Sequence, residues 1–238
     1  MVYYRAQVFI QTLWNLICQY CAEIRSNVFQ YRPDISLNEV IYYDFETTGL
    51  NPYHDDIIEF AFLEEDSGDY LNELVNPQCK FEKKITDITG IHPDELVDKP
   101  IITEHMTNII SFINQSNRPY GFTTYLIAHN NDGFDKIFLN ETIKRINKDR
   151  DDEITINNCQ YIDTLLLAKK LLPNLRSYSL KTLATLFDIT AGTHRALDDT
   201  KCLQKVYHNL LEIMSTDLNI SKQTLLENPN RVYNYLYN

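Results

Sequence analysis

The residues with the clearest chemical potential are two carboxylates at the end of a predicted strand, in the segment IYYDFETTGL at positions 41–50. Side chains two apart on a strand share a face, so Asp44 and Glu46 would point together toward one place. Two neighbouring anions at a buried strand end repel each other and lose hydration, and a divalent metal ion with oxygen ligands would relieve both costs. The alternative is an ordinary polar strand end, because Asp-x-Glu occurs by chance in most chains.

A third carboxylate, Asp135, closes the segment AHNNDGFD at positions 128–135. This segment follows a predicted buried strand and opens a helix, where loops of α/β sheets commonly place functional groups. If the two strands are neighbours, Asp135 would lie near the carboxyl end of the first one. The alternative is an ordinary helix start, because Asn, Asp and Gly are common there and Asp favours the positive end of the helix dipole.

The segment THRALDDT at positions 193–200 adds a histidine and further carboxylates. His194 and Asp199 are five apart, which puts them on different faces of a continuous helix. They converge only if His194 sits in the loop before the helix and Asp199 faces inward from its second turn. A histidine beside a metal-bound carboxylate is what a hydrolase needs to take a proton from water near neutral pH. Two alternatives are open, because Asp198 competes for the inward position and the segment also fits a capped surface helix.

The elements around these residues form one alternating α/β unit with additions at both ends. Hydrophobic periodicity predicts strands over 40–45, 56–64, 69–75, 123–129 and 159–163. The same criterion predicts helices over 6–29, 103–116, 133–148, 164–172, 179–187 and 195–214. The short connections between the first three strands predict antiparallel neighbours. We therefore expect an N-terminal helical extension over 1–38, a catalytic domain over 39–214 and a helical, polar C-terminal tail over 215–238.

The amino-acid composition of the chain argues against some classes of protein. The formal net charge of −11 over 238 residues argues against a protein that coats duplex nucleic acid, because such proteins usually carry a basic face. An enzyme that grips only a chain end through a metal cluster does not need that basic excess. No apolar run approaches the roughly 20 residues that span a membrane, so no membrane association is expected. The five scattered cysteines favour reduced thiols and an intracellular location, cytoplasmic or nuclear.

The three motifs together resemble a known family. DFETTGL, HNNDGFD and HRALDDT, in that order, are similar to the three motifs of the DEDDh (DnaQ-like) 3′–5′ exonucleases, which include the epsilon subunit of bacterial polymerase III, the TREX exonucleases and RNase T. The segments at 88–96 and 161–187 also resemble this family, and the resemblance covers about residues 38–214. The three residues between His-Asn and Phe-Asp in the second motif resemble the spacing of TREX-like members.

The resemblance implies a fold and a chemistry. The fold would be the RNase H-like exonuclease fold, with a mixed five-stranded sheet flanked by helices. Two Mg²⁺ or Mn²⁺ ions would bind the scissile phosphate, and the product would be a nucleoside 5′-monophosphate from a DNA 3′ end, single-stranded or mismatched. Such an enzyme would serve repair, degradation or proofreading. The implied metal ligands are Asp44, Glu46, Asp135 and Asp199, with His194 as the proton acceptor. The implied substrate contacts are Thr47, Leu50, Ile88 and Phe134.

Two other functions fit the same residues. An exoribonuclease would use the same chemistry and would add a pocket that accepts the 2′-hydroxyl of the terminal sugar. A catalytically idle module would bind nucleic-acid ends or a polymerase. A homodimer or a polymerase partner is left open, since the sequence does not decide between them.

Overall fold

The computed structural model describes residues 38–114 and 123–238. The predicted helix at 6–29 and nearly all of the predicted N-terminal extension lie outside the described residues. The described chain contains five strands: β1 (Asn38–Thr47), β2 (Ile57–Glu64), β3 (Tyr70–Leu74), β4 (Thr123–Ala128) and β5 (Cys159–Asp163). All five strands were expected from the sequence, and their observed ends differ from the expected ones by at most a few residues.

The five strands form one mixed sheet in the order β3-β2-β1-β4-β5. The first three strands are antiparallel neighbours, as their short connections predict, whereas β1, β4 and β5 run parallel. The expected mixed five-stranded sheet flanked by helices is thus confirmed. Because β1 and β4 are parallel neighbours, their carboxyl ends meet at one edge of the sheet, where α/β proteins place their functional groups.

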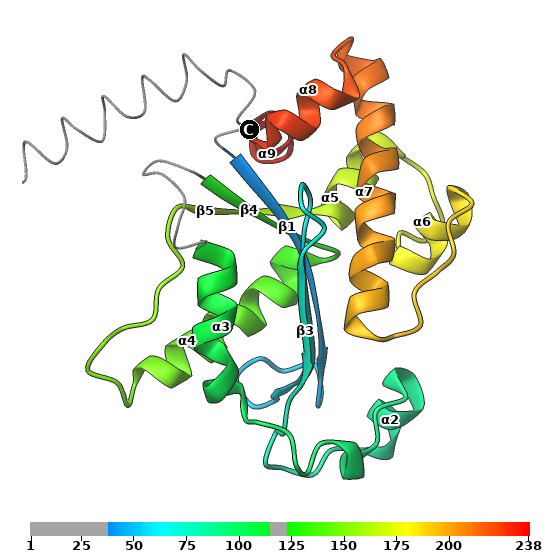
Figure 1. The fold of residues 1–238 in the computed structure, drawn as a ribbon. Helices are drawn as coiled ribbons and strands as arrows, with labels where there is room; N and C mark the ends of the chain where they lie inside the picture. Colours follow the sequence, from blue (N-terminus) through cyan, green and yellow to red (C-terminus); the bar gives the residue numbers. More distant parts are fainter. Residues whose placement is uncertain (1–37, 115–122) are drawn as a thin grey trace, which may run out of the picture.

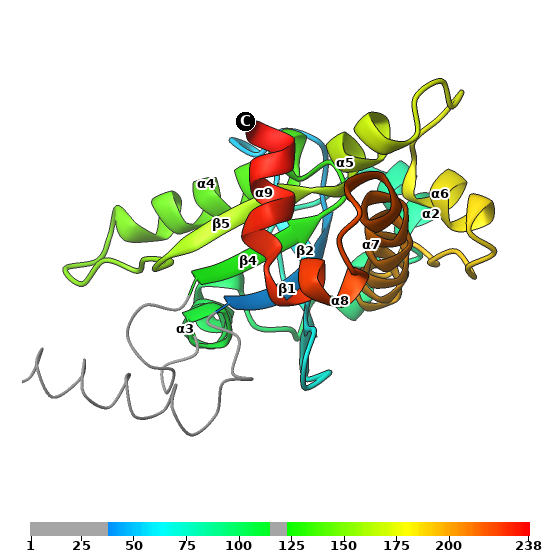
Figure 2. The ribbon, with the colours of Figure 1, turned by 90° about the horizontal axis from the view of Figure 1, so that it is seen from above.

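Helices cover both faces of this sheet (Figures 1 and 2). The helices are α2 (Lys83–Thr89), α3 (Ile102–Asn114), α4 (Asp135–Asn147), α5 (Thr164–Leu171), α6 (Leu180–Leu186), α7 (Ala196–Leu218), α8 (Lys222–Glu227) and α9 (Pro229–Tyr237), with short 3₁₀ turns η1 (Pro93–Glu95) and η2 (Asn131–Gly133). Helix α4 begins two residues later than expected because η2 occupies the turn before it. Helix α7 runs four residues past the expected end and stops at Asn219, which adopts a left-handed conformation.

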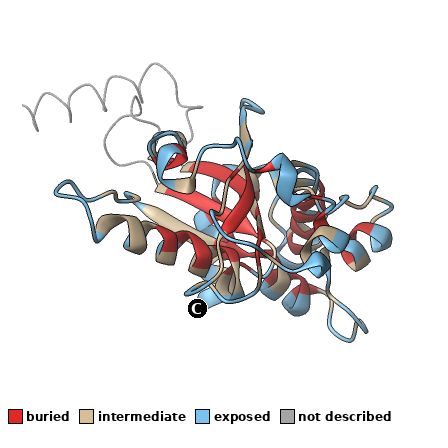
Figure 3. Cartoon of the chain, turned by 90° about the horizontal axis from the view of Figure 1, so that it is seen from below, coloured by how far each residue is buried: buried red, intermediate tan, exposed pale blue. Residues whose placement is uncertain are grey.

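The two larger apolar cores form because the strands alternate their side chains between the two faces. On β1, Val40 and Tyr42 pack into the core shared with α5 through α9, whereas Ile41 and Tyr43 pack against α3 and α4. The centre of the sheet is therefore buried on both sides (Figure 3). Asp44 and Glu46 continue the first series, so they emerge on the α7 side, beyond the apolar stretch of the same strand.

The C-terminal residues fold back onto the domain. Leu225 of α8 and Val232 of α9 are buried in the core on the α7 side, and α9 packs beside β5 and α5. Within the described residues, no helix is long and apolar enough to cross a membrane.

Candidate metal centre

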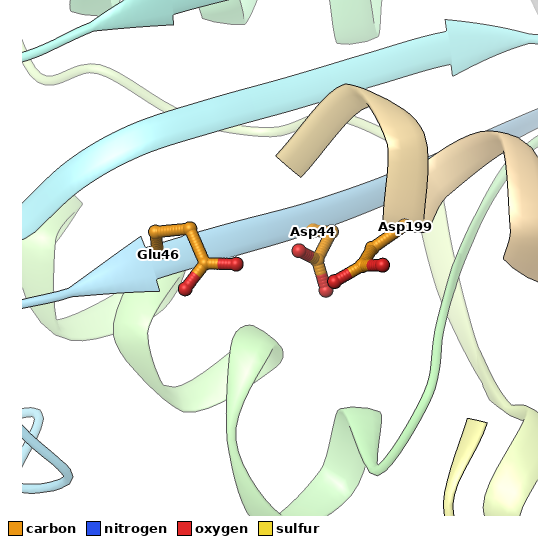
Figure 4. A group of neighbouring side chains, drawn as sticks. All are labelled: Asp44, Glu46 and Asp199. Atoms are coloured by element: carbon orange, nitrogen blue, oxygen red, sulfur yellow. The ribbon is translucent and has the colours of Figure 1, made fainter. Parts of the chain in front are cut away.

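Three carboxylates meet at the carboxyl end of β1. Asp44, Glu46 and Asp199 each offer an oxygen atom, and these atoms all lie within 4.8 Å of one another (Figure 4). Asp44 and Glu46 come from successive inward positions of β1, and Asp199 comes from the start of α7. Oxygen ligands grouped at this spacing are what a divalent cation such as Mg²⁺ or Mn²⁺ prefers. The donor set thus fits the divalent-metal site that the sequence predicts.

Helix α7 presents Asp199, rather than Asp198, to this group. The helix begins at Ala196, so Asp199 lies in its first turn. The sequence had predicted that Asp199 would lie in the second turn. Asp198 is exposed and accepts a hydrogen bond of 2.7 Å from the Thr193 hydroxyl. The rotation of α7 about its axis, fixed by packing on β1 and β2, decides between the two residues.

Asp135 lies next to the three carboxylates but is not one of that group. Its buried Oδ1 accepts a hydrogen bond of 3.2 Å from the backbone N–H of Phe45, the residue between Asp44 and Glu46. The pairing of β1 with β4 ends at Tyr42, so Asp135 takes the place of β4 as the partner of Phe45. Its charge is among the main causes that raise the pKa of Asp44, after burial. Asp135 therefore flanks Asp44 on the β4 side.

Two polar side chains that the sequence reading did not single out hold the loop before Asp135. The buried amide of Asn131 donates to the carbonyl groups of Leu126 and Ile162, each at 3.1 Å, and its Oδ1 accepts from the Tyr43 hydroxyl. Asp163 accepts from the backbone N–H groups of Asn130 and Asp132, each at 3.1 Å, and also caps α5. An aspartate directly before the apolar segment TLLLA was the available sequence signal, since it marks a helix N-cap.

His194 lies in the loop before α7, as the convergence argument requires. Its side chain is exposed and its backbone has a positive φ of 58°, a left-handed conformation that is uncommon for a residue other than glycine. Burial raises the pKa of Asp199, and the nearby His194 opposes that rise. The histidine thus stands directly beside one member of the carboxylate group.

Burial and mutual repulsion raise the pKa values of the carboxyl groups in this cluster, so these groups ionise less readily when no cation is bound. Burial, together with the charges of Asp199 and Glu59, raises the pKa of Glu46 to about 8. Burial likewise raises the pKa of Asp135 to about 8, against the effect of its backbone hydrogen bonds, and raises that of Asp44 well above its usual range. A bound divalent cation would favour the ionised carboxylates, so metal binding should release protons.

These shifts predict how the stability of the metal-free protein depends on pH. A carboxyl group whose folded pKa exceeds its unfolded pKa stabilises the fold below the unfolded value, and this stability is lost as pH rises through the folded value. For Glu46 the window runs from its ordinary 4.5 to about 8. In EDTA we therefore expect a lower melting temperature at pH 8.5 than at pH 5.5, with each lost kcal/mol lowering it by about 2–4 °C. Mg²⁺ should restore most of the loss at pH 8.5, and Glu46→Gln should flatten the dependence. A melting temperature that is independent of pH in EDTA would contradict the prediction.

Gly192 makes room for the Asp199 carboxylate. A Cβ atom at position 192 would lie 1.5 Å from Oδ1 of Asp199 and 3.0 Å from its Cα, so Gly192→Ala must displace the carboxylate or the loop. We expect a loss of nuclease activity of about 100-fold, since a shift of about 1 Å in a catalytic group can cost that much. Gly68→Ala is the control, because Gly68 has a positive φ of 73° but open space around it. That variant should lose stability and keep its activity, and equal activity losses in the two variants would contradict the prediction.

The four residues expected to touch substrate come from three separate segments of the chain. Thr47 is buried directly after Glu46, and its hydroxyl donates to the carbonyl of Gly49 at 2.5 Å. Leu50 is 84% exposed, Ile88 is 45% exposed and Phe134 is half-buried against Phe138. Leu50 and Ile88 thus present apolar surface to solvent, whereas much of the Phe134 side chain packs against the core.

The comparisons with known proteins agree with this geometry. The DNA polymerase III PolC-type of Thermotoga petrophila is 34% identical over 189 residues, which are 78% of this chain and 13% of that protein. The PolC-type polymerase of Bacillus subtilis is 32% identical over 165 residues, 68% of this chain and 10% of that protein. The chain therefore spans only about an eighth of the length of the curated relatives that it matches.

Solved structures of exonuclease I share the fold. The zinc-bound E. coli exonuclease I complex with single-stranded DNA has a TM-score of 0.60 at 22% identity and covers 76% of this chain and 41% of that one. The enzyme from Methylocaldum szegediense has a TM-score of 0.59 at 20% identity and covers 80% of this chain and 42% of that one. The expected RNase H-like exonuclease fold is thus confirmed, whereas the TREX-like spacing of the second motif stays a prediction.

A family model described as Exonuclease (RNase_T) matches residues 41–207, from the core of β1 to the middle of α7. This range contains all three motifs and every carboxylate of the candidate centre. The chain belongs to the exonuclease family.

Proposed function

We propose that this protein is a metal-dependent 3′–5′ exonuclease that removes nucleoside 5′-monophosphates from DNA 3′ ends, single-stranded or mismatched. The observation that carries the proposal is the meeting of Asp44, Glu46 and Asp199 within 4.8 Å, with Asp135 on one side and His194 on the other. The activity is assigned to residues 39–214, with residues 215–238 packed on that unit as an appendage.

The proposed metal ligands are Asp44, Glu46, Asp135 and Asp199, holding two Mg²⁺ or Mn²⁺ ions. When bound, these ions would neutralise the charge on the phosphate under attack and favour the deprotonation of water. Asp135 differs in position from the other three proposed ligands. Its Oδ1 accepts a hydrogen bond from the Phe45 N–H, and it approaches the centre from the β4 side.

Residues of the chain itself would accept the proton of the attacking water and contact the substrate. His194 would accept the proton of the attacking water, whose oxygen bonds to phosphorus while the bond to the 3′ oxygen breaks; a solvent proton then completes the 3′-hydroxyl. The exposure of His194 leaves it free to exchange that proton with solvent. Thr47 and Leu50 would contact the terminal nucleotide, and Ile88 and Phe134 would flank the bases.

DNA is proposed as the substrate because the relatives are named DNA polymerases and because exonuclease I has been solved with single-stranded DNA and with a dA16 oligonucleotide. The net charge of −11 fits an enzyme that binds a chain end at a metal centre and not one that binds along a duplex.

The test uses oligonucleotides labelled at the 5′ end, as single-stranded DNA, 3′-mismatched duplex DNA and RNA of the same sequence. Stepwise shortening of DNA with Mg²⁺ or Mn²⁺, blocked by EDTA, is the expected result, with nucleoside 5′-monophosphate as the product. A preparation carrying both Glu46→Gln and Asp199→Asn controls for contaminating nucleases. Faster shortening of RNA than of DNA would favour the exoribonuclease, and no shortening of either polymer would overturn the proposal.

A further inference from the structure

Glu59 is a further acidic residue beside the group formed by Asp44, Glu46 and Asp199, and its role differs from that of those three carboxylates. Glu59 of β2 pairs directly with Glu46 of β1 across the antiparallel ladder, and its side chain is 2% exposed. Two glutamates opposite each other in a sheet repel, and a buried carboxylate without a partner is strongly destabilising. The pair can persist only because something nearby compensates Glu59.

The main compensating groups come from the start of α7. The guanidinium of Arg195 donates from Nε to Oε2 of Glu59 at 3.0 Å and from Nη2 to Oε1 at 2.9 Å. The backbone N–H of Ala196 donates to the same Oε2 at 3.0 Å, and Asn72 makes a longer bond of 3.4 Å to Oε1. Both oxygens of Glu59 are thus engaged, which explains why it lies outside the group of potential metal ligands.

This contact sits at the residue that follows His194. A left-handed backbone is unfavourable for a residue with a side chain, so it persists only where its surroundings fix it. On one side, the Thr193 hydroxyl donates to the Asp198 carboxylate at 2.7 Å. On the other side, Arg195 and Ala196 are fixed to β2 through Glu59. The loop is therefore held from both ends.

We propose that Glu59 and Arg195 form a positioning pair for the reaction. By joining β2 to the first residue of α7, the pair sets where His194 and Asp199 stand relative to Asp44 and Glu46, which the ladder places directly beside Glu59. The fork of Arg195 matches the two carboxylate oxygens, a geometry that neither lysine nor glutamine reproduces. The kinetic part of this inference rests on the proposed exonuclease activity.

The experiment compares four variants of the full chain: Arg195→Gln, Glu59→Gln, the double variant and Arg195→Lys. For each single glutamine variant we expect kcat to fall by about 10- to 100-fold, with less change in the KM for DNA, because supporting residues of metal sites have effects of that size. The double variant should be no slower than the worse single variant, since both remove one contact. Arg195→Lys should recover part of the loss.

Glu65→Gln is the matched control. Glu65 also joins the sheet to α7, by accepting from Gln204 at 3.0 Å and by lying 2.9 Å from Nε2 of His208, but it does so away from His194. Loss of this contact should leave kcat within about threefold of the parent chain. Multiplicative losses from Glu59→Gln and Arg195→Gln, or a rise in KM alone for Arg195→Gln, would overturn the proposal, because Arg195 would then act on the substrate directly.

Hydrogen exchange gives a readout that does not need activity. In metal-free protein, Glu59→Gln and Arg195→Gln should speed amide exchange over residues 194–199, whereas Glu65→Gln should leave that segment unchanged. Melting curves show whether each variant is folded. If the parent chain has no exonuclease activity but this exchange difference appears, the proposed function fails and the positioning pair stands. Unchanged exchange in both variants would overturn the positioning pair.

Discussion

Asp44→Asn is expected to reduce exonuclease activity by about 1,000-fold or more while leaving the protein folded. Asp44 is the central acidic residue of the site, since it belongs to the three-carboxylate group and also feels the charge of Asp135. Metal-ion catalysis contributes several kcal/mol of charge stabilisation, and each 1.36 kcal/mol is a factor of ten in rate. An amide keeps the shape of the side chain but lacks the charge that binds a divalent cation.

The same substitution should stabilise the metal-free protein. Burial and then repulsion by the neighbouring carboxylates raise the pKa of Asp44, so removing its charge ends the cost of burying that charge and relieves the other carboxylates. We expect a higher melting temperature in EDTA at pH 8 for Asp44→Asn than for the parent chain, and a weaker response to added Mn²⁺. Opposite changes in activity and stability are typical of residues retained for function.

Asp198→Asn is the control for this prediction. It removes one negative charge from the same region, but Asp198 is exposed and lies outside the carboxylate group. Single-turnover rates with saturating Mg²⁺ should stay within about threefold of the parent rate, as for most surface substitutions. An Asp44→Asn rate close to that of Asp198→Asn would contradict the assignment of Asp44 to the metal centre.

His194→Ala is expected to lower kcat by about 100- to 10,000-fold, which is the usual contribution of a positioned general base. The KM for DNA and the affinity for Mn²⁺ should change far less, because His194 lies beside Asp199 without belonging to the carboxylate group. The loss should shrink at high pH, where hydroxide supplies the deprotonated nucleophile. Rates across pH 6–9 under single-turnover conditions measure this difference.

His208→Ala provides the comparison on the same helix. His208 Nε2 lies 2.9 Å from a Glu65 carboxylate oxygen, about two and a half turns along α7 from Asp199. Its loss should lower stability slightly and leave the pH profile of kcat unchanged. A similar pH profile for His194→Ala and the parent chain would show that another group accepts the proton.

The choice between Asp198 and Asp199 could have been made from the sequence, by extending the apolar pattern of α7. Leu203, Val206 and Leu210 are buried, and they follow Asp199 at intervals of four, seven and eleven residues. Residues at these intervals lie on one helical face, so Asp199 shares the buried face. Asp198 instead shares its face with Lys201 and Lys205, which are exposed.

The sequence by itself determined the five strands, the shared strand face of Asp44 and Glu46 and the position of His194 before a helix. These features follow from local rules, since a strand alternates its side chains and a helix has a definite start. The order and spacing of the three motifs also identified the family, because each motif is short and continuous along the chain.

Only the tertiary structure decided how the distant segments meet. The bond between Asp135 and the Phe45 N–H depends on where β4 stops pairing with β1. The contact of Glu59 with Arg195 spans 136 positions and depends on the ladder register that sets Glu59 opposite Glu46. Strand register and the point where two strands stop pairing are fixed by packing across the whole core, and no local pattern of residue types encodes them.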